Sequence, residues 1–436
     1  MKILLVNKEC TMGGVETLML ALAPIYKSEG YHCEIFFFKH GPMEKYLPVD
    51  CTIHFGDLPD LLRLIDSKGF DVVHANSTDW DLGVSAVRNM GAKLVVTAHG
   101  WIVPTWTSAN CDAFVGCSKW LADDQQPLTD LPAKVVLNGV DVDKFKPNEN
   151  TAATSPPIVA WVGRGTAVEQ KRIDKFAAIA PALRRAGVQI RLVESYGAEK
   201  VAKVAPKAAR ALLPVVDFWR AVHREDMPGF YQEVAASGGC VVSTSSFEGL
   251  PMTLLEAQAC GCPVIAPDVL GVNECVDPAY GSVLYEFQMQ PEQLASLVLE
   301  TLNDTKQMEW RRKTCVPYVR EQFSMKRMAQ QYLRIYREAP YSRRKNLANI
   351  QARARLSPFL NWGDYVAYRW SPGNDQYEAS RKLAELGEWK LASALARTAL
   401  TTCPTLFVKP KRLTHLIKAV MHPDSSTSRS HTTTCV

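Results

Sequence analysis

Two glutamates eight positions apart, Glu248 and Glu256, lie in a segment between two short apolar runs. Gly249 permits a tight backbone, and Pro251 suits the first turn of a helix. The free N–H groups at such a helix start bind phosphate, and ionised carboxylates accept hydrogen bonds from sugar and ribose hydroxyls. If only this pair is considered, the favoured interpretation is that Glu248 caps a helix and that Glu256 is a solvated helix residue. The residues predicted to form this anion site are Gly249, Leu250, Pro251, Met252 and Thr253.

A second segment, residues 163–174, follows the apolar run 158–162 and carries Arg164 and Lys171. A guanidinium and an ammonium group on a loop that leaves a strand can hold a diphosphate. Solvated surface is the alternative for either residue alone. The segment contains neither the GxGxxG pattern of a dinucleotide site nor the GxxxxGK[ST] pattern of a P-loop.

Near the N-terminus, Gly13 and Gly14 follow an apolar run and would let the backbone approach a ligand closely, with a structural turn as the alternative. His99 follows the apolar run 94–97, and ligands bind at the carboxyl ends of strands in open α/β sheets. We therefore predict a functional role for His99. His74 ends the preceding run, and for it we predict a structural role.

Short apolar runs alternate with amphipathic stretches as far as residue 340. This alternation predicts two doubly wound α/β domains that face a cleft, each with a parallel sheet covered by helices on both faces. A polar, proline-containing linker is predicted at 148–157. Strands are predicted at 3–6, 34–38, 72–74, 94–97, 113–116, 158–162, 189–193, 215–218, 240–243 and 263–266. Helices are predicted at 15–27, 58–66, 82–90, 119–126, 173–185, 227–236, 251–259 and 292–302, and a helical hairpin at 379–400.

The composition is that of a globular protein, with 47% hydrophobic and 22% charged residues. No apolar run is long enough to span a bilayer, and the start of the chain reads as a buried strand and not as a signal peptide. Its 12 cysteines are scattered without a CxxC pair. We therefore expect a reduced, cytoplasmic chain.

Charge is distributed unevenly along the chain. Residues 1–145 carry 12 basic and 18 acidic residues, a net of −6, whereas residues 341–436 carry 15 basic and 6 acidic residues, a net of +9. An anionic partner is therefore expected at the tail. The basic stretch 341–356 could be a solvated helix, a membrane-surface patch or a strap docked on the first domain. Docking is favoured because it would bury the aromatic cluster that follows: Trp362, Tyr365, Tyr368 and Trp370.

Together these segments resemble the family-4 retaining glycosyltransferases of the GT-B fold, over about residues 1–338. The resemblance is carried by Gly13-Gly14-Val15-Glu16, Val96-Thr97-Ala98-His99-Gly100, the segments 115–118, 137–147, 161–164 and 171–174, the pair Glu248 and Glu256, and the helix that begins near 323. Many members have a hydrophobic residue after the arginine and a glycine after the lysine. This sequence has Gly165 and Arg172 at those positions.

The resemblance implies a role for each site residue. Arg164 and Lys171 would hold the donor diphosphate, and Gly14 would bring backbone to the phosphate beside Gly13. Glu248 would contact the donor sugar and Glu256 the ribose, while His99 would reach across the cleft. The resemblance implies retention at the anomeric carbon, with no metal required because the two cations replace one electrostatically.

The domain organisation expected from these features is as follows: an acceptor-side Rossmann-like domain (1–147), a nucleotide-sugar-binding Rossmann-like domain (155–323), a helix crossing back to the first domain (324–340), a basic, aromatic-rich helical extension (341–424) and a disordered tail (425–436).

The expected function is transfer of a hexose-type sugar from a UDP- or GDP-sugar to a glycan or lipid-linked acceptor in bacterial surface polysaccharide biosynthesis. We expect no nucleic-acid partner and a location in the cytoplasm. Peripheral contact of the basic tail with the inner face of the membrane is the alternative to docking of that tail. A GT-B sugar-nucleotide epimerase or phosphorylase is the alternative enzyme. A catalytically silent GT-B scaffold is the alternative of another class, and the joint presence of Arg164, Lys171, Glu248 and Glu256 argues against it.

Overall fold

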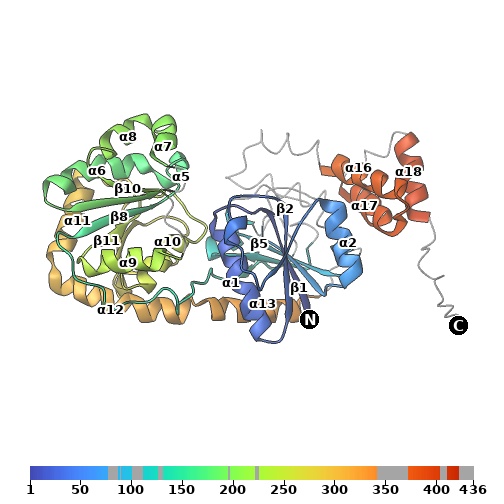
Figure 1. Cartoon of the computed structure of the whole chain (residues 1–436), viewed down its shortest axis with the longest axis horizontal. Helices are drawn as coiled ribbons and strands as arrows, with labels where there is room; N and C mark the ends of the chain where they lie inside the picture. Colours follow the sequence, from blue (N-terminus) through green and yellow to red (C-terminus); the bar gives the residue numbers. More distant parts are fainter. Residues whose placement is uncertain are drawn as a thin grey trace. The chain divides into compact units, whose positions relative to one another are not determined.

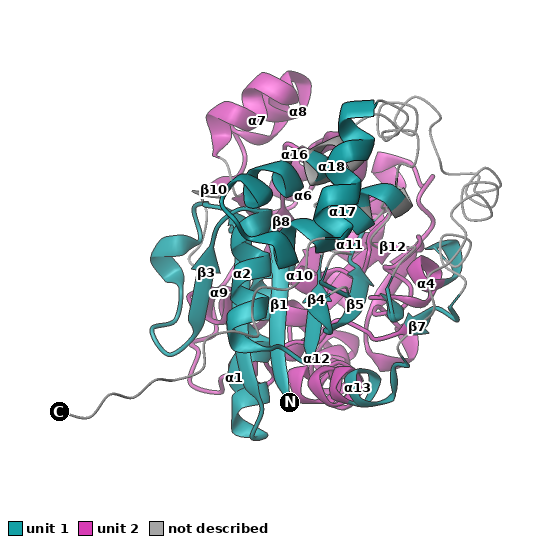
Figure 2. Ribbon diagram, turned by 90° about the vertical axis from the view of Figure 1, so that its right-hand side faces the viewer, with its two compact units in different colours: residues 1–115, 123–134, 334–436 teal, residues 116–122, 135–333 magenta. Residues whose placement is uncertain are grey.

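The computed structural model describes residues 1–76, 87–88, 90–100, 111–125, 131–194, 197–220, 225–340, 372–402 and 410–421. The chain forms two compact units (Figure 1 and Figure 2). Unit 1 comprises residues 1–115, 123–134 and 334–436, and unit 2 comprises residues 116–122 and 135–333. Each unit contains a parallel sheet with helices packed on it, which confirms the predicted α/β fold class.

Unit 1 is built on a seven-stranded sheet in the order β3-β2-β1-β4-β5-β6-β7. Its strands are β1 (Lys2–Glu9), β2 (His32–Lys39), β3 (Thr52–Phe55), β4 (Val72–Ala75), β5 (Lys93–Ala98), β6 (Ala113–Gly116) and β7 (Lys134–Val135). Between them lie α1 (Gly14–Ser28), η1 (Glu44–Tyr46), α2 (Leu58–Lys68) and α4 (Lys119–Gln125). Strand β1 pairs with β2 on one side and with β4 on the other. The strand order reverses its direction here, so the sheet has a topological switch point between β1 and β4. Most of the predicted helix 82–90 lies outside the described residues.

Unit 2 is built on a six-stranded sheet in the order β10-β9-β8-β11-β12-β13, with its switch point between β8 and β11. Its strands are β8 (Ile158–Gly163), β9 (Gln189–Glu194), β10 (Asp217–Arg220), β11 (Cys240–Val242), β12 (Val264–Pro267) and β13 (Val283–Tyr285). Its helices are α5 (Val168–Lys171), α6 (Ile173–Arg185), α7 (Ala198–Val204), α8 (Pro206–Leu212), α9 (Met227–Ala236), α10 (Met252–Ala259), η4 (Pro278–Tyr280), α11 (Pro291–Asn303) and α12 (Thr305–Gln322). The prediction placed β10 two residues too early.

Helix α13 (Met325–Glu338) spans the boundary between the units, which falls after Leu333. At its start, the amide of Met325 donates to the carbonyl of Val140 at 2.9 Å, within unit 2. In its last turns, the ring of Tyr336 packs edge-on against Tyr26 and His74, within unit 1. One continuous helix therefore contributes buried side chains to both units.

The C-terminal extension is helical where it is described. It forms α16 (Pro372–Glu385), α17 (Trp389–Thr402) and α18 (Pro410–Met421), and the turn after α16 uses Gly387 at φ +79°. The first two helices pack on α2, where buried Leu383 and Leu391 join the cluster that contains Leu61. Arg63 of α2 pairs with Glu388, and Asp66 pairs with Lys390. The extension therefore docks on unit 1 through both apolar and charged contacts.

The predicted basic stretch 341–356, the aromatic cluster 362–370 and the tail 425–436 lie outside the described residues. Within the described part of the chain, no helix is both long and apolar enough to cross a bilayer.

Candidate functional site

The two loops that carry the predicted donor residues of unit 2 leave neighbouring strands. Residues 164–167 follow β8, and residues 243–251 follow β11, the strand that pairs with β8. Because both loops leave the carboxyl ends of strands that flank the switch point, they lie where doubly wound sheets bind ligands.

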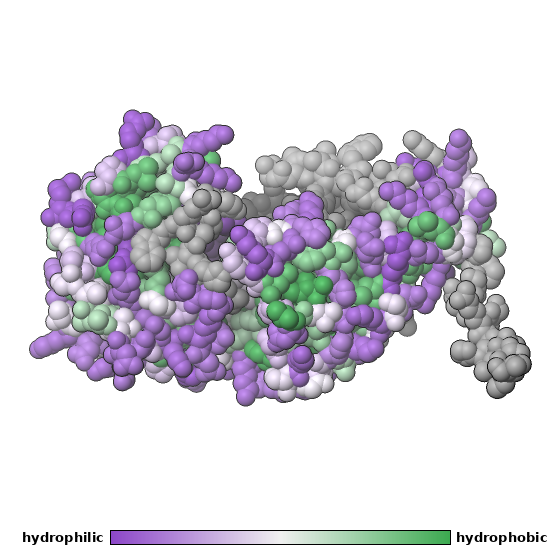
Figure 3. All heavy atoms as spheres, in the orientation of Figure 1, coloured by the Kyte–Doolittle hydropathy of each residue, from purple (hydrophilic) through white to green (hydrophobic). Residues whose placement is uncertain are grey.

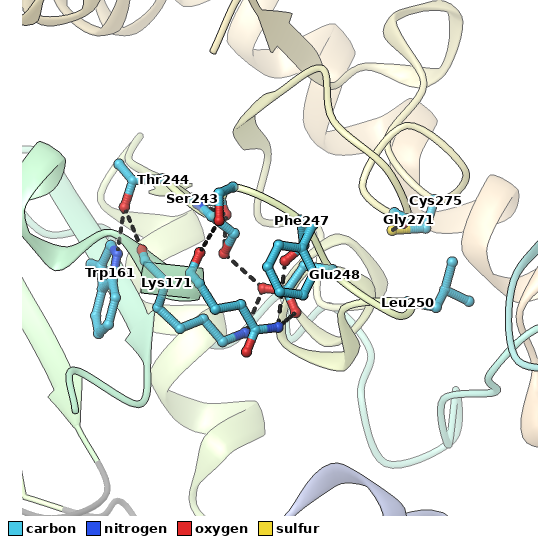
Figure 4. A network of polar contacts seen from close by, with 12 residues as sticks. Trp161, Lys171, Ser243, Thr244, Phe247, Glu248, Leu250, Gly271 and Cys275 are labelled. Atoms are coloured by element: carbon cyan, nitrogen blue, oxygen red, sulfur yellow. Dashed lines mark hydrogen bonds and ion pairs between the residues drawn. The ribbon is translucent and has the colours of Figure 1, made fainter. Parts of the chain in front are cut away.

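Glu248 is the centre of a polar cluster in these loops (Figure 4). Its carboxylate accepts hydrogen bonds from Lys171 Nζ at 2.5 Å, Ser245 Oγ at 2.7 Å and Gln170 Nε2 at 3.2 Å. Glu248 is only 6% exposed, and the Lys171 side chain is 14% exposed. A buried carboxylate is therefore paired with the lysine that ends α5, as a buried charge requires. Glu248 does not cap α10, because the N-cap is Pro251.

The backbone at Lys171 is held in an unusual turn. The next residue, Arg172, has φ 48° and ψ 51°, the left-handed conformation in which glycine is the usual residue. Thr244 Oγ1 lies 3.0 Å from the carbonyl oxygens of Lys171 and Arg172, and it accepts a hydrogen bond from Trp161 Nε1. The side chain of Arg172 pairs with Asp174. The arginine that replaces the family's glycine thus adopts a glycine-like conformation and keeps Lys171 directed at Glu248.

Arg164 is exposed and lies directly after β8. The following Gly165 is buried, and a Cβ at that position would lie 2.9 Å from Ile173 and 3.0 Å from Val201. Its amide donates to Glu194, a fully buried carboxylate at the end of β9 that also accepts from the amide of Gly197. A larger residue at this position would therefore require the side chains of Ile173 and Val201 to move. Glu194 was missed from the sequence, although an acid that ends a buried strand is a usable signal.

Helix α10, at whose start the anion site was predicted, begins one residue later than predicted. The helix begins at Met252, and Pro251 is its N-cap. Gly249 and Leu250 are buried, whereas Met252 and Thr253 are partly exposed. First-turn amides of a helix lack intrahelical partners and favour anions.

Glu256 lies on α10 and is 8% exposed, so it is not a solvated helix residue. Tyr231 donates a hydrogen bond to its carboxylate at 3.3 Å. Burial, and then the charge of Glu256, raise the pKa of Tyr231 well above its usual range, so the phenol stays a donor. Glu248 and Glu256 therefore hold different partners, one a lysine and the other a tyrosine.

In unit 1 the Gly13–Gly14 pair starts α1, with Gly13 as N-cap. A Cβ on Gly13 would lie 2.4 Å from a carboxylate oxygen of Glu16, so a larger residue there would have to displace this carboxylate. Glu16 is buried and accepts hydrogen bonds from Asn7 and Thr11. Burial raises its pKa, although these hydrogen bonds lower it in part.

His74 and His99 of unit 1 differ in their surroundings. His74 is fully buried, and its ring nitrogens bond to Tyr336 Oη at 2.6 Å and Thr97 Oγ1 at 2.8 Å. Burial, and then the nearby His99, lower the pKa of His74 to about 3, so it is neutral at physiological pH. The predicted structural role of His74 is confirmed. His99 is partly exposed after β5, with Nε2 3.3 Å from Asn76 Oδ1.

Among the residues that the structure describes, no group of three or more His, Cys, Asp or Glu side chains is arranged to hold a metal ion.

Two family models match consecutive parts of the chain. The model described as Glycosyltransferase Family 4 matches residues 12–144, and the model described as Glycosyl transferases group 1 matches residues 156–304. Together they cover all six strands of the unit 2 sheet and every strand of the unit 1 sheet except β1.

Two curated bacterial enzymes are similar in sequence. The alpha-maltose-1-phosphate synthase of Mycolicibacterium smegmatis is 27% identical over 332 residues, covering 64% of this chain and 82% of that protein. The lipopolysaccharide core biosynthesis mannosyltransferase LpsB of Rhizobium meliloti is 25% identical over 301 residues, covering 62% of this chain and 78% of that protein.

Solved structures share the fold. A glycosyltransferase from Rickettsia africae matches with a TM-score of 0.65 at 17% identity, covering 78% of this chain and 98% of the other. Anabaena HepE, solved in complex with UDP and glucose, matches with a TM-score of 0.63 at 18% identity, covering 78% of this chain and 100% of the other. The two-sheet architecture is therefore that of the GT-B fold.

Proposed function

The chain belongs to the family-4 retaining glycosyltransferases, and we propose that it moves a hexose-type sugar from a nucleotide diphosphate sugar to a hydroxyl of a glycan or glycolipid acceptor. The observation that carries this proposal is the pairing of Lys171 with Glu248 at the switch point of unit 2. A cation and a sugar-directed carboxylate are thereby fixed beside the start of α10, where a diphosphate would be stabilised.

In the proposed site, Lys171 and the exposed Arg164 bind the donor diphosphate. The first-turn amides of α10 at Met252 and Thr253 contribute further donors. Glu248 accepts hydrogen bonds from sugar hydroxyls, and Glu256 accepts one from the ribose. For unit 1, we propose a ligand contact from the backbone of Gly14 and one from the imidazole of His99, as the family resemblance implies.

The proposed reaction breaks the bond between the anomeric carbon and the diphosphate oxygen and forms a bond from that carbon to the acceptor oxygen on the same face. The proton of the acceptor hydroxyl passes to the departing phosphate oxygen. Lys171 and Arg164 stabilise the charge that develops on that phosphate, a contact stronger in the transition state than in the ground state. This scheme needs no protein carboxylate as nucleophile and no metal ion.

The relatives support a role in bacterial surface polysaccharide biosynthesis. LpsB acts in lipopolysaccharide core biosynthesis, and HepE was solved with UDP and with glucose. We propose a UDP- or GDP-sugar as the donor on this basis.

The extension supports a peripheral membrane contact as a further part of this proposal. Helix α18 exposes Leu413, Ile417 and Met421, and it carries exposed Lys411 and Lys418 but no acid. Apolar side chains flanked by lysines suit an anionic membrane surface. Sedimentation with anionic vesicles tests this, with Leu413→Ser/Ile417→Ser as the variant. Binding that is unchanged in this variant, or absent from the native protein, would contradict the contact.

A donor screen tests the enzymatic proposal. Sugar-nucleotide hydrolysis and thermal shift are measured for UDP- and GDP-hexoses, with and without glycan acceptors. Stabilisation by one nucleotide sugar, with its turnover accelerated by an acceptor, is expected. Conversion of the donor sugar without transfer would indicate an epimerase or phosphorylase, and no stabilisation by any donor would indicate a silent scaffold.

A further inference from the structure

A tryptophan outside the predicted site contacts the loop that carries Glu248. The chain leaves β6 and enters residues 116–122, which belong to unit 2. There the indole Nε1 of Trp120 donates to the carbonyl oxygen of Glu248 at 2.8 Å and lies 3.2 Å from that of Gly249. The sequence patterns did not single out Trp120.

Trp120 is itself fixed by an acid from a third loop. The amide of Trp120 donates to one carboxylate oxygen of Glu274 at 2.9 Å, and the amide of Lys119 donates to the other at 2.5 Å. Glu274 follows β12, so it comes from the strand next to β11. Both amides at the start of α4 are thereby bound to one side chain, which sets the position of the indole.

The loop is also held along its other carbonyl and amide groups. Asn138 Nδ2 donates to the carbonyl of Leu250 at 3.2 Å, so three consecutive carbonyls, 248–250, accept from side chains. The amide of Glu248 donates to the carbonyl of Leu270 at 2.9 Å. Gly271, at φ +77°, passes so close that a Cβ there would lie 2.0 Å from the Glu248 carbonyl oxygen. The backbone at Glu248 is therefore clamped from both sides.

We propose that Trp120, held by Glu274, is a positioning residue that sets the orientation of Glu248 towards the donor sugar. Its indole keeps the carbonyls of 248 and 249 turned to one side, and the Glu248 carboxylate is then directed at Lys171 and at the sugar. This inference rests on the proposed function, because that function supplies the sugar that the Glu248 carboxylate would bind.

The test variant is Trp120→Phe, which keeps an apolar ring but removes the N–H donor. Loss of two hydrogen bonds to a buried loop should lower kcat for transfer by about tenfold and weaken nucleotide-sugar binding, while binding of the free nucleoside diphosphate stays unchanged. The nucleoside diphosphate lacks the sugar that Glu248 is proposed to contact. The matched control is Trp310→Phe, at an exposed tryptophan of α12.

A readout that needs no activity is hydrogen–deuterium exchange across residues 246–251. Exchange there should accelerate in Trp120→Phe and in Glu274→Ala and stay native-like in Trp310→Phe. The double variant should match the singles, because both act through one contact. If Trp120→Phe does not fold, Glu274→Ala decides by the same measurements.

Native kinetics and native exchange in Trp120→Phe would overturn the inference. So would an equal loss of affinity for the nucleotide sugar and for the free nucleoside diphosphate. Failure of the proposed function itself is distinguishable, since the native protein would then transfer no sugar while the exchange result for the loop would still stand.

Discussion

The segments that follow β1 in unit 1 and β11 in unit 2 each contain a buried acid, and the two acids have different partners. In unit 1, the Glu16 carboxylate accepts from the neutral Asn7 and Thr11, and its pKa is raised. In unit 2, the Glu248 carboxylate accepts a hydrogen bond from the cationic Lys171. The Glu16 carboxylate is therefore held by neutral donors near the start of α1, whereas the Glu248 carboxylate is paired with a cation that could also bind an ionic ligand.

His74 of unit 1 and Lys171 of unit 2 also differ in whether they can bind a ligand. His74 is fully buried with both ring nitrogens bonded, so it has no free position for a substrate. Lys171 is partly exposed, and its ammonium group has three N–H donors. Lys171 can therefore offer an ionic group to a ligand, whereas His74 cannot.

The largest expected effect on kcat is that of replacing the two cationic residues, Lys171 and Arg164. Lys171→Ala should reduce kcat by about a hundredfold or more, because it removes a charge contact made in the transition state. It should also lower Tm, since buried Glu248 loses its cation. Arg164→Ala should cause a similar kinetic loss with native Tm, because Arg164 is exposed. Steady-state kinetics and thermal melts measure both, with Lys313→Ala on α12 as control. Near-native kcat in either variant would remove that residue from the donor site.

The next effect separates the two glutamates. Glu248→Gln should lower kcat by about tenfold to a hundredfold, because a hydrogen bond to a charged group is lost where the sugar reacts. Glu256→Gln should instead raise KM for the donor with kcat little changed, as expected for a contact of equal strength in ground and transition states. Glu309→Gln, at an exposed position on α12, is the control. The assignment is wrong if Glu256 governs kcat and Glu248 has no effect.

The acid stability of unit 1 should depend on His74. The unfolded chain binds a proton at this residue as pH falls through 6.5, whereas burial lowers the folded pKa to about 3. Stability is therefore full above that window and is lost as pH falls through it, by up to about 1.4 kcal/mol per pH unit. Comparing the pH dependence of the unfolding free energy for the native protein and His74→Gln measures this. Identical slopes would show that His74 is not held neutral.

The smallest effect is expected at the docked extension. Arg63 and Glu388 form a bidentate contact, but their side chains are 39% and 31% exposed. A double-mutant cycle with Arg63→Ala and Glu388→Ala should give a coupling of about 0.2–1 kcal/mol. A 1–340 truncation should lower Tm more, because it uncovers the apolar face of α2. A truncated chain with native Tm would show that the docking adds no stability.

Strand and helix periodicity predicted most of both sheets because their strands are continuous apolar runs. Helix α12 was not predicted from the sequence. Only Met308, Cys315 and Val319 of its 18 residues are buried, and Pro317 lies inside it, so it has little apolar periodicity. Hydrophilic side chains predominate along α12 in Figure 3. The edge strand β3 was missed for a related reason, since no residue in it is fully buried.

The candidate site was predictable to the extent that its residues lie in local motifs. The loops after β8 and β11 could be paired because parallel strands end at one edge. The partners from distant segments could not be predicted. Trp120 and Glu274 are 154 positions apart, and local spacing gives no signal for their hydrogen bond. The left-handed conformation of Arg172 could not be predicted either, because the residue is an arginine and not the glycine that usually adopts it.

The central claim is that the Lys171–Glu248 site performs retaining transfer from a nucleotide sugar. The most direct measurement is proton NMR of the products formed from the accepted donor in excess EDTA, with the native protein and Lys171→Ala side by side. The account predicts a product with the donor's anomeric configuration, formed at an undiminished rate with chelator and about a hundredfold more slowly in Lys171→Ala. A product of inverted configuration, or equal rates for the two proteins, would contradict it.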